Sequence, residues 1–283
     1  IVNNIDLSGK GGLVWTNNRD NDSYGNNIFD TVRGAGKMLI GDTDAAEANE
    51  GNTLTQFNNN GFRINDDNNI NINTESYVSW TFRKQPKFFD IQTYTGNRQD
   101  TNSYQDITHN LGSTPGMIIV KETSSADDWM VYHRSANSAD GIVLKLNTTD
   151  AASDGGNVIF DVSEINSSSF RVGNMNNVNA NGVSYVAYIF AHNNDDGGFG
   201  EPGDQDIIKC GSYTGNGNDN GPEITLGFEP QFFMFKKTSG TGNWFVYDTT
   251  RGWGTGDSTV SGTDSSGPYL LWNEANQEAT SNR

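Results

Sequence analysis

Cysteine, proline and long apolar runs are scarce in this sequence of 283 residues, which has 1 Cys, 6 Pro and 33% hydrophobic residues. The single Cys210 excludes an internal disulfide framework and a zinc site built on cysteines. No apolar run reaches the ~18–20 residues that cross a bilayer, so we expect no membrane insertion. Basic residues are also few, since 18 Lys and Arg stand against 35 Asp and Glu for a net charge of −17. Such a chain repels phosphate, so nucleic acid and anionic lipid are not expected as partners.

A sustained helical spacing of apolar residues is absent as well. Short apolar or alternating runs recur instead, at Met117–Val120, Tyr185–Phe190 and Phe232–Phe235. Clusters of Asn and Gly separate these runs, and both residue types favour turns. Aromatic residues make up 11% of the chain and bury large areas, which opposes disorder. The sequence predicts an all-β fold of antiparallel, jelly-roll-like β-sandwiches.

The chain repeats itself over long segments. Leu111–Tyr132 matches Leu226–Tyr247 without a gap, and the shared Trp129 and Trp244 lie 115 positions apart. Upstream of each copy stands a Tyr-Thr-Gly-Asn tetrad, beginning at Tyr94 in one copy and at Tyr213 in the other. A spacing of about 105–120 residues is a usual domain size and is too long for a solenoid repeat.

The N-terminal part is an earlier copy of the same unit. Ser76–Phe82 corresponds to the closing strand Ser184–Phe190, and nothing after the third copy's Arg-Gly segment corresponds to that strand. We therefore predict two complete β-sandwich repeats and one truncated repeat. Their expected limits are residues 1–90 for the first, which lacks the lead-in strand, 91–202 for the second and 203–283 for the third. The truncation predicts that the sequence is an internal piece of a longer chain.

These motifs resemble the repeated β-domain of tailed-bacteriophage virion proteins of the marine or cyanophage type. The resemblance rests on Leu13–Trp15, Arg19–Asp20, Val32–Ala35, Tyr77–Trp80 and the Val178–Tyr188 series, and it covers nearly the whole chain. It implies a component of the particle surface or of an appendage such as a tail fibre, and an oligomer, with a trimer as one arrangement. It brings no catalytic motif, and the third copy departs from the pattern because it has no closing strand.

No group of residues indicates catalysis, so we predict a protein without enzymatic activity. The three histidines, His109, His133 and His192, occupy unrelated places in the repeats. A histidine base should be accompanied by a nucleophile and an orienting acid, which the pattern does not supply. Carboxylate pairs such as Asp161 with Glu164 are expected by chance in a chain with 35 acidic residues.

Calcium is the candidate cofactor. Runs of acidic and amide residues offer the oxygen ligands that Ca²⁺ takes, although none has the spacing of a helix-loop-helix calcium loop. A solvated turn explains each run equally well. The candidate ligands are Asp20, Asp22, Asp66, Asp67, Asp195, Asp196 and Asp219.

Recurring aromatic residues are expected in the core, because each unit must rebuild the same interior. Trp129, Trp244 and the closing-strand residues Tyr77, Trp80, Tyr185 and Tyr188 are in this group. Trp253 and Trp272 lie in Gly- and Asn-rich surroundings and are the candidates for an exposed contact or an anchor between subunits.

Arginine follows an acidic strand end twice, as Asp30 with Arg33 and Asp248 with Arg251. We interpret each pair as a local ion pair that holds a turn, and the alternative is an arginine free to clamp a sugar acid. Cys210 is expected to behave as a small buried residue.

Two functions follow from these observations. The first is a structural component of a phage particle, with like chains and other virion proteins as partners and the virion surface or tail as its location. The second is a carbohydrate- or receptor-binding module for host attachment, with a host-surface glycan as its partner. Depolymerase activity is a distant third.

Overall fold

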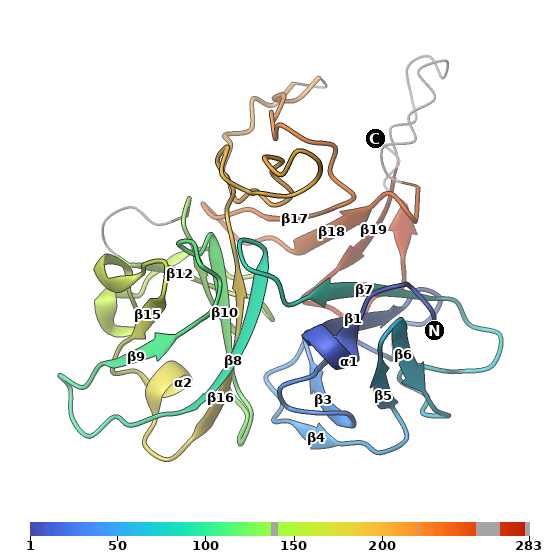
Figure 1. Ribbon diagram of the computed structural model, residues 1–283, viewed down its shortest axis with the longest axis horizontal. Helices are drawn as coiled ribbons and strands as arrows, with labels where there is room; N and C mark the ends of the chain where they lie inside the picture. Colours follow the sequence, from blue (N-terminus) through green and yellow to red (C-terminus); the bar gives the residue numbers. More distant parts are fainter. Residues whose placement is uncertain (137–140, 219, 253–266, 281–283) are drawn as a thin grey trace.

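The computed structural model describes residues 1–136, 141–218, 220–252 and 267–280, and it confirms the all-β class. Antiparallel strands form three main sheets, which meet near the middle of the molecule (Figure 1). Within the described residues, helix is limited to the short segments α1 (Leu7–Lys10), η1 (Gly156–Val158), η2 (Val162–Glu164) and α2 (Asn176–Asn179).

The first sheet has the strand order β4-β3-β2-β1-β7. Its strands are β1 (Gly12–Asn18), β2 (Asn27–Asp30), β3 (Lys37–Ile40), β4 (Ala48–Asn49) and β7 (Tyr77–Arg83). A hairpin of β5 (Leu54–Asn58) and β6 (Gly61–Ile64) covers its outer face together with α1. This layer buries Val14, Phe29 and Met38 on the outer side of the sheet.

The second sheet has the order β13-β12-β11-β10-β16-β8. Its strands are β8 (Phe89–Thr95), β10 (Met117–Glu122), β11 (Met130–His133), β12 (Ile142–Lys145), β13 (Ser153–Asp154) and β16 (Ser184–Phe190). A small sheet of β14 (Phe160–Asp161), β15 (Ser169–Val172) and β9 (Gln105–Thr108) covers its outer face. The short helix η1 (Gly156–Val158) precedes β14, which begins at Phe160.

The third sheet has the order β17-β18-β19-β20. Its strands are β17 (Phe232–Lys236), β18 (Trp244–Asp248), β19 (Pro268–Leu271) and β20 (Ala279–Thr280). The order repeats that of the first two sheets, so β1, β10 and β17 hold the same position. The strand registers agree: the pair Trp15 and Ile28 corresponds to Ile119 with Val131 and to Met234 with Val246.

One apolar core joins the three sheets. Buried residues of β1, β7, β10, β11, β16, β18 and β19 belong to a single cluster. Five of the described tryptophans lie in it. The ring centroids of Trp15 and Trp272 are 4.1 Å apart, and those of Trp129 and Trp272 are 6.4 Å apart. Each sheet therefore buries its inner face against the other two, while the predicted limits of the repeats stay a prediction.

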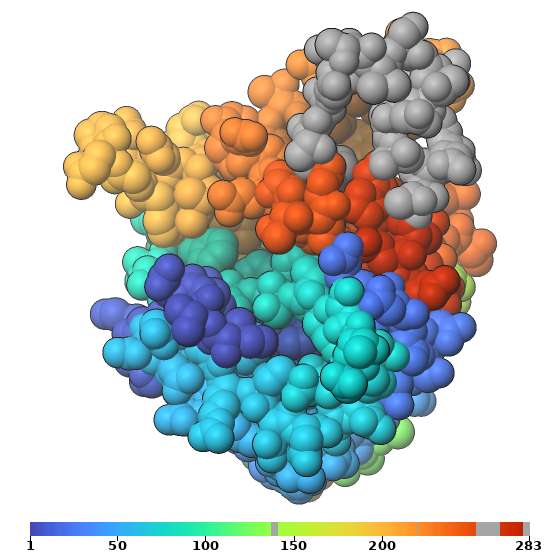
Figure 2. All heavy atoms as spheres, turned by 90° about the vertical axis from the view of Figure 1, so that its right-hand side faces the viewer, coloured from blue at the N-terminus to red at the C-terminus, as the bar shows by residue number. Residues whose placement is uncertain are grey.

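Backbone hydrogen bonds between sheets form a closed cycle. The N–H of Glu47, after β3, donates to the carbonyl of Thr123, after β10, at 2.9 Å. Ala152 donates in the same way to Thr238, and Glu278 donates to Arg19, each at 2.9 Å. The third sheet thus returns to the first, and Figure 2 shows its orange and red residues directly against the blue residues of the N-terminal part.

Side chains follow the same cycle. The indole N–H of Trp129 donates to the carbonyl of Thr43 at 3.0 Å, and that of Trp244 donates to Lys145 at 2.9 Å. At the corresponding place in the first sheet, the amide of Asn26 donates to the carbonyl of Trp272 at 2.8 Å. Each of these hydrogen bonds between sheets satisfies a polar group that burial would otherwise leave unpaired.

Candidate functional site

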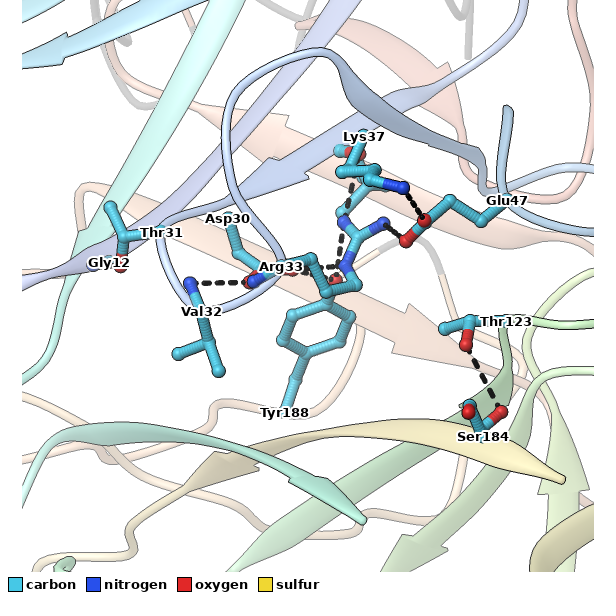
Figure 3. A network of polar contacts seen from close by, with 11 residues as sticks. Gly12, Asp30, Thr31, Val32, Arg33, Lys37, Glu47, Thr123, Ser184 and Tyr188 are labelled. Carbon is cyan, nitrogen blue, oxygen red and sulfur yellow. Dashed lines mark hydrogen bonds and ion pairs between the residues drawn. The ribbon is translucent and has the colours of Figure 1, made fainter. Parts of the chain in front are cut away.

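A buried ionic network links the first sheet to the second (Figure 3). Asp30 ends β2, and its carboxylate accepts the backbone N–H of Val32 and of Arg33 at 2.9 Å. The guanidinium of Arg33 pairs with Asp30 at 2.5 Å and with Glu47 at 3.1 Å. It also donates to the hydroxyl of Tyr188 on β16 at 3.1 Å, and that hydroxyl donates to Asp30 at 2.9 Å. We call Asp30, Arg33, Glu47 and Tyr188 the first junction cluster.

The charge of Arg33 is held inside the protein by its partners. Its side chain is 4% exposed, and that of Asp30 is 0% exposed. Burial opposes the charged form, but Tyr188, Asp30 and Glu47 outweigh it and raise the pKa of Arg33. Burial also raises the pKa of Tyr188 well above its usual value, so the hydroxyl stays protonated and donates. An ion pair at this depth depends on every partner being in place.

The third sheet contains an equivalent network, the second junction cluster, made of Trp80, Asp248, Arg251 and Glu278. Arg251 pairs with Asp248 at 2.6 Å and with Glu278 at 3.1 Å. The indole N–H of Trp80 on β7 donates to Asp248 at 3.1 Å. The guanidinium also lies 5.3 Å from the Trp80 ring centroid, a cation–π distance.

Both clusters connect a turn to the closing strand of another sheet. The expected ion pairs at the turns are confirmed, but they are buried and extend beyond the turn. The alternative of an arginine free to clamp a sugar acid is wrong, because the side chains of Arg33 and Arg251 are 4% and 1% exposed. The local sequence patterns did not predict the closing-strand partners Tyr188 and Trp80. Both residues occupy the same position of the repeat, and this recurrence could have indicated a shared contact.

Among the described residues, the second sheet has no such cluster at the corresponding position. His133 ends β11 where Asp30 ends β2, and Ala136 stands in the place of Arg33. Burial, together with the nearby Arg134 and His192, lowers the pKa of His133 to about 4. A neutral imidazole therefore replaces the ionic network here.

The Nδ1 atom of each of the three histidines accepts a hydrogen bond from a backbone N–H group. The Nδ1 atoms of His109 and His133 accept the N–H of the residue two positions on, at 3.3 Å. The Nδ1 atom of His192 accepts the N–H of Cys210 at 3.1 Å. Burial raises the pKa of Cys210 to about 12, so its thiol is protonated at neutral pH.

Of the two predicted contact tryptophans, Trp253 lies outside the described residues. Trp272 is 6% exposed and belongs to the central core, so the expectation of an exposed contact is wrong for this residue. Its indole N–H donates to the carbonyl of Gly41 at 3.1 Å. The Gly- and Asn-rich surroundings were misleading because Trp272 packs against residues that are distant in sequence.

Most recurring aromatic residues are in the core as predicted. Trp129, Trp244, Trp80, Tyr185 and Tyr188 are all less than 9% exposed. Tyr77 is only half-buried, and its hydroxyl accepts the backbone N–H of Ile72 at 3.0 Å.

Three of the candidate calcium ligands accept hydrogen bonds from backbone N–H groups. Asp20 accepts the N–H of Ser76 at 2.6 Å, Asp67 accepts that of Asn69 at 2.8 Å, and Asp196 accepts that of Asn194 at 2.9 Å. Asp22, Asp66 and Asp195 are exposed, and Asp219 lies outside the described residues. Among the described residues, no three His, Cys, Asp or Glu side chains converge as a metal site. Calcium remains a prediction.

The third sheet differs from the other two on its outer face and at its edge. Its outer residues are aromatic and half-buried: Phe233, Phe235, Phe245, Tyr247 and Tyr269. At the corresponding positions of β10, Ile118 and Val120 are fully buried. In the described part of the chain, β17 pairs only with β18, whereas β1 and β10 each have a closing strand on the other side. This edge is the clearest candidate interaction surface.

Comparison with known proteins gives one finding about the family. No curated protein and no solved structure matches the chain. Within the described residues, no helix has the length and apolar character needed to span a membrane. A family model described as "Domain of unknown function (DUF7483)" matches residues 4–282. The chain therefore belongs to the DUF7483 family.

Proposed function

We propose that this chain is a non-enzymatic structural component of a tailed-phage particle, part of a tail fibre, a spike or another surface appendage. One observation carries the proposal: the residues that recur along the sequence join one sheet to the next. Trp129, Trp244 and the two junction clusters all make contacts between sheets. Recurring residues used in this way support a scaffold role.

The charge distribution fits the same role. Few of the described charged residues are buried, so the net charge of −17 is carried largely by the surface. A surface of one sign keeps a particle component soluble while it is exposed. The proposed partners are like chains and other virion proteins, and the proposed location is the particle surface or tail.

Immunogold labelling of intact particles tests the proposal. An antibody raised against the purified chain is expected to label a fibre, a spike or the shell of particles from a phage that encodes this sequence. A denatured-particle blot serves as the control for the presence of the protein. A protein found in the infected-cell lysate but absent from both the intact and the denatured particles would refute the structural role.

Binding to a host polysaccharide or receptor is the second candidate. The half-buried aromatic face of the third sheet favours it, because aromatic rings form stacking surfaces for sugars. A glycan array probed with the chain and with the Phe245→Ala, Tyr269→Ala double variant tests this role. The wild-type protein is expected to give a signal that the double variant loses, and equal signals would exclude this face.

A further inference from the structure

The strands β1, β10 and β17 carry an equivalent residue near their ends. It lies two positions before the residue whose carbonyl accepts the backbone hydrogen bond from the preceding sheet. This residue is a lysine in the second and third sheets and an asparagine in the first. The three residues are Asn17 on β1, Lys121 on β10 and Lys236 on β17. Two junctions between sheets therefore contain a cation that the chain supplies, and the third junction contains a neutral amide.

Lys121 lies at the junction between the first and second sheets. Its Nζ atom donates to the carbonyl of Asp44, which follows β3, at 3.2 Å and to the carbonyl of Glu122 at 2.7 Å. The residue is 0% exposed. Burial lowers the pKa of Lys121 to about 8, and nearby carboxylates such as that of Glu122 oppose this shift, so the ammonium group is largely charged at neutral pH. One buried positive charge thus binds carbonyl oxygens of two sheets.

Lys236 makes the equivalent contacts at the junction between the second and third sheets. Its Nζ atom donates to the carbonyl of Thr149, which follows β12, at 3.1 Å. It also donates to the carbonyl of Lys237 at 3.3 Å and to that of Gly242 at 2.6 Å. Both lysines therefore bind one carbonyl oxygen of the preceding sheet and the carbonyl oxygen of the next residue in the chain.

Asn17 faces the junction between the third and first sheets. Its Nδ2 atom donates to Oδ1 of Asn26 at 3.0 Å, and Asn26 donates to the carbonyls of Leu271 and Trp272 in the third sheet. Asn17 is 0% exposed, and its Oδ1 atom has no hydrogen-bond partner among the described residues. Because a buried amide oxygen without a partner is costly, most such atoms in native proteins are paired. This oxygen therefore indicates a ligand.

The carbonyl groups that the lysines bind have counterparts beside Asn17. In both lysine junctions, the acceptor in the preceding sheet lies three positions before the donor of the backbone bond between sheets. That donor is Glu278 in the third sheet, so the equivalent carbonyl is that of Ala275. The acceptor after the lysine corresponds to Asn18. The third junction thus combines two carbonyl oxygens and one amide oxygen at the position of a lysine ammonium group.

We propose that the junction between the third and first sheets binds a monovalent cation of the size of K⁺, with oxygen atoms of Asn17, Asn18 and Ala275 as ligands. Cations of this kind are bound by backbone carbonyl and amide oxygens. The distances from Nζ to oxygen at the lysine junctions are 2.6–3.3 Å. Ca²⁺ binds oxygen at about 2.3–2.6 Å, so the larger ion fits this spacing better. The ion replaces one positive charge and needs no carboxylate ligand, unlike the acidic runs considered for calcium.

Thermal melting of the purified chain tests the proposal. KCl or NaCl replaces tetramethylammonium chloride at constant ionic strength, which keeps the screening of the acidic surface unchanged. Tetramethylammonium is too large to be surrounded by the three oxygen atoms. The melting temperature is expected to rise saturably with K⁺, by about 3 °C or more once K⁺ exceeds its dissociation constant tenfold, and to rise less with Na⁺.

Asn17→Lys gives the first sheet the residue that the other two sheets have. This variant is expected to melt in tetramethylammonium chloride as the wild-type protein does in KCl, and to lose the response to K⁺. The matched control is Asn59→Lys, which adds the same charge at an exposed position and is expected to respond as the wild-type protein does. Asn17→Asp keeps an oxygen ligand and adds a negative charge, so it is expected to respond at a lower K⁺ concentration. It tests the site even where Asn17→Lys does not fold.

A crystal grown with thallium(I) acetate gives direct evidence, because Tl⁺ substitutes for K⁺ and scatters anomalously. An anomalous peak is expected beside Oδ1 of Asn17. Equal melting temperatures in the potassium and tetramethylammonium salts would overturn the proposal. A response to K⁺ that persists in a folded Asn17→Lys variant, or an unchanged response in Asn17→Asp, would also overturn it. So would a water molecule without anomalous density beside Asn17 in the thallium crystal.

Discussion

Replacing Arg33 by Met tests whether the first junction cluster holds the sheets together. The variant keeps the length of the side chain but removes the partner of Asp30, which is 0% exposed, and of Glu47. It also leaves the carbonyl of Ile28 and the hydroxyl of Tyr188 without this donor. Breaking a buried ion pair by removing one partner costs about 3–5 kcal/mol, so we expect the free energy of unfolding to fall by that amount.

Urea denaturation followed by tryptophan fluorescence measures this loss. The matched control is Arg171→Met, because Arg171 pairs with Asp106 at 2.7 Å but the two side chains are 29% and 54% exposed. An exposed pair contributes about 0–1 kcal/mol, so the control is expected to change little. A double variant, Asp30→Leu with Arg33→Met, is expected to recover part of the loss, since no unpaired charge remains. A loss for Arg33→Met no larger than that for the control would refute the reasoning.

Three further predictions concern the core, the pH dependence and the metal. A Cβ atom added to Gly41 would lie 3.0 Å from the Trp272 ring, so Gly41→Ala is expected to destabilise the protein by about 1–3 kcal/mol in urea denaturation. Gly51→Ala, where no atom lies within 4 Å of the added Cβ, is the control, and equal effects would contradict the packing. Because the pKa of His133 is lowered from 6.5 to about 4, the unfolded state takes up its proton first as the pH falls. The melting temperature should therefore fall between pH 6.5 and pH 4, and it should fall less steeply in His133→Asn. The same dependence of the melting temperature on pH in both proteins would contradict the burial of His133. If the protein binds a structural calcium ion, excess EDTA is expected to lower its melting temperature. An unchanged melting temperature would exclude a structural calcium ion.

The strand-forming segments were predictable because their signals are local. The apolar run at 117–120 became part of β10, and the aromatic run at 232–235 became part of β17. The burial of Trp129 and Trp244 was also predictable, since a repeated unit rebuilds its interior from the same residues. The four-residue helices were missed because segments this short carry no helical periodicity.

The contacts between sheets were not predictable from local patterns. Arg33 looked like half of an exposed turn, and only the packing of β16 against it placed Tyr188 in the same network. Trp272 looked exposed for the same reason, since Trp15 and Gly41, which enclose its ring, are more than two hundred positions away in the sequence.

The sequence by itself determined the β-class, the recurrence of the strands and the acidic surface, because alternation, repetition and charge are properties of consecutive residues. Only the tertiary structure decided that the three sheets close into a cycle around one core. Hydrogen bonds such as Glu278 to Arg19 join the last sheet to the first. The tertiary structure also decided that the edge of β17 is unpaired in the described chain, because pairing depends on which strand lies beside an edge.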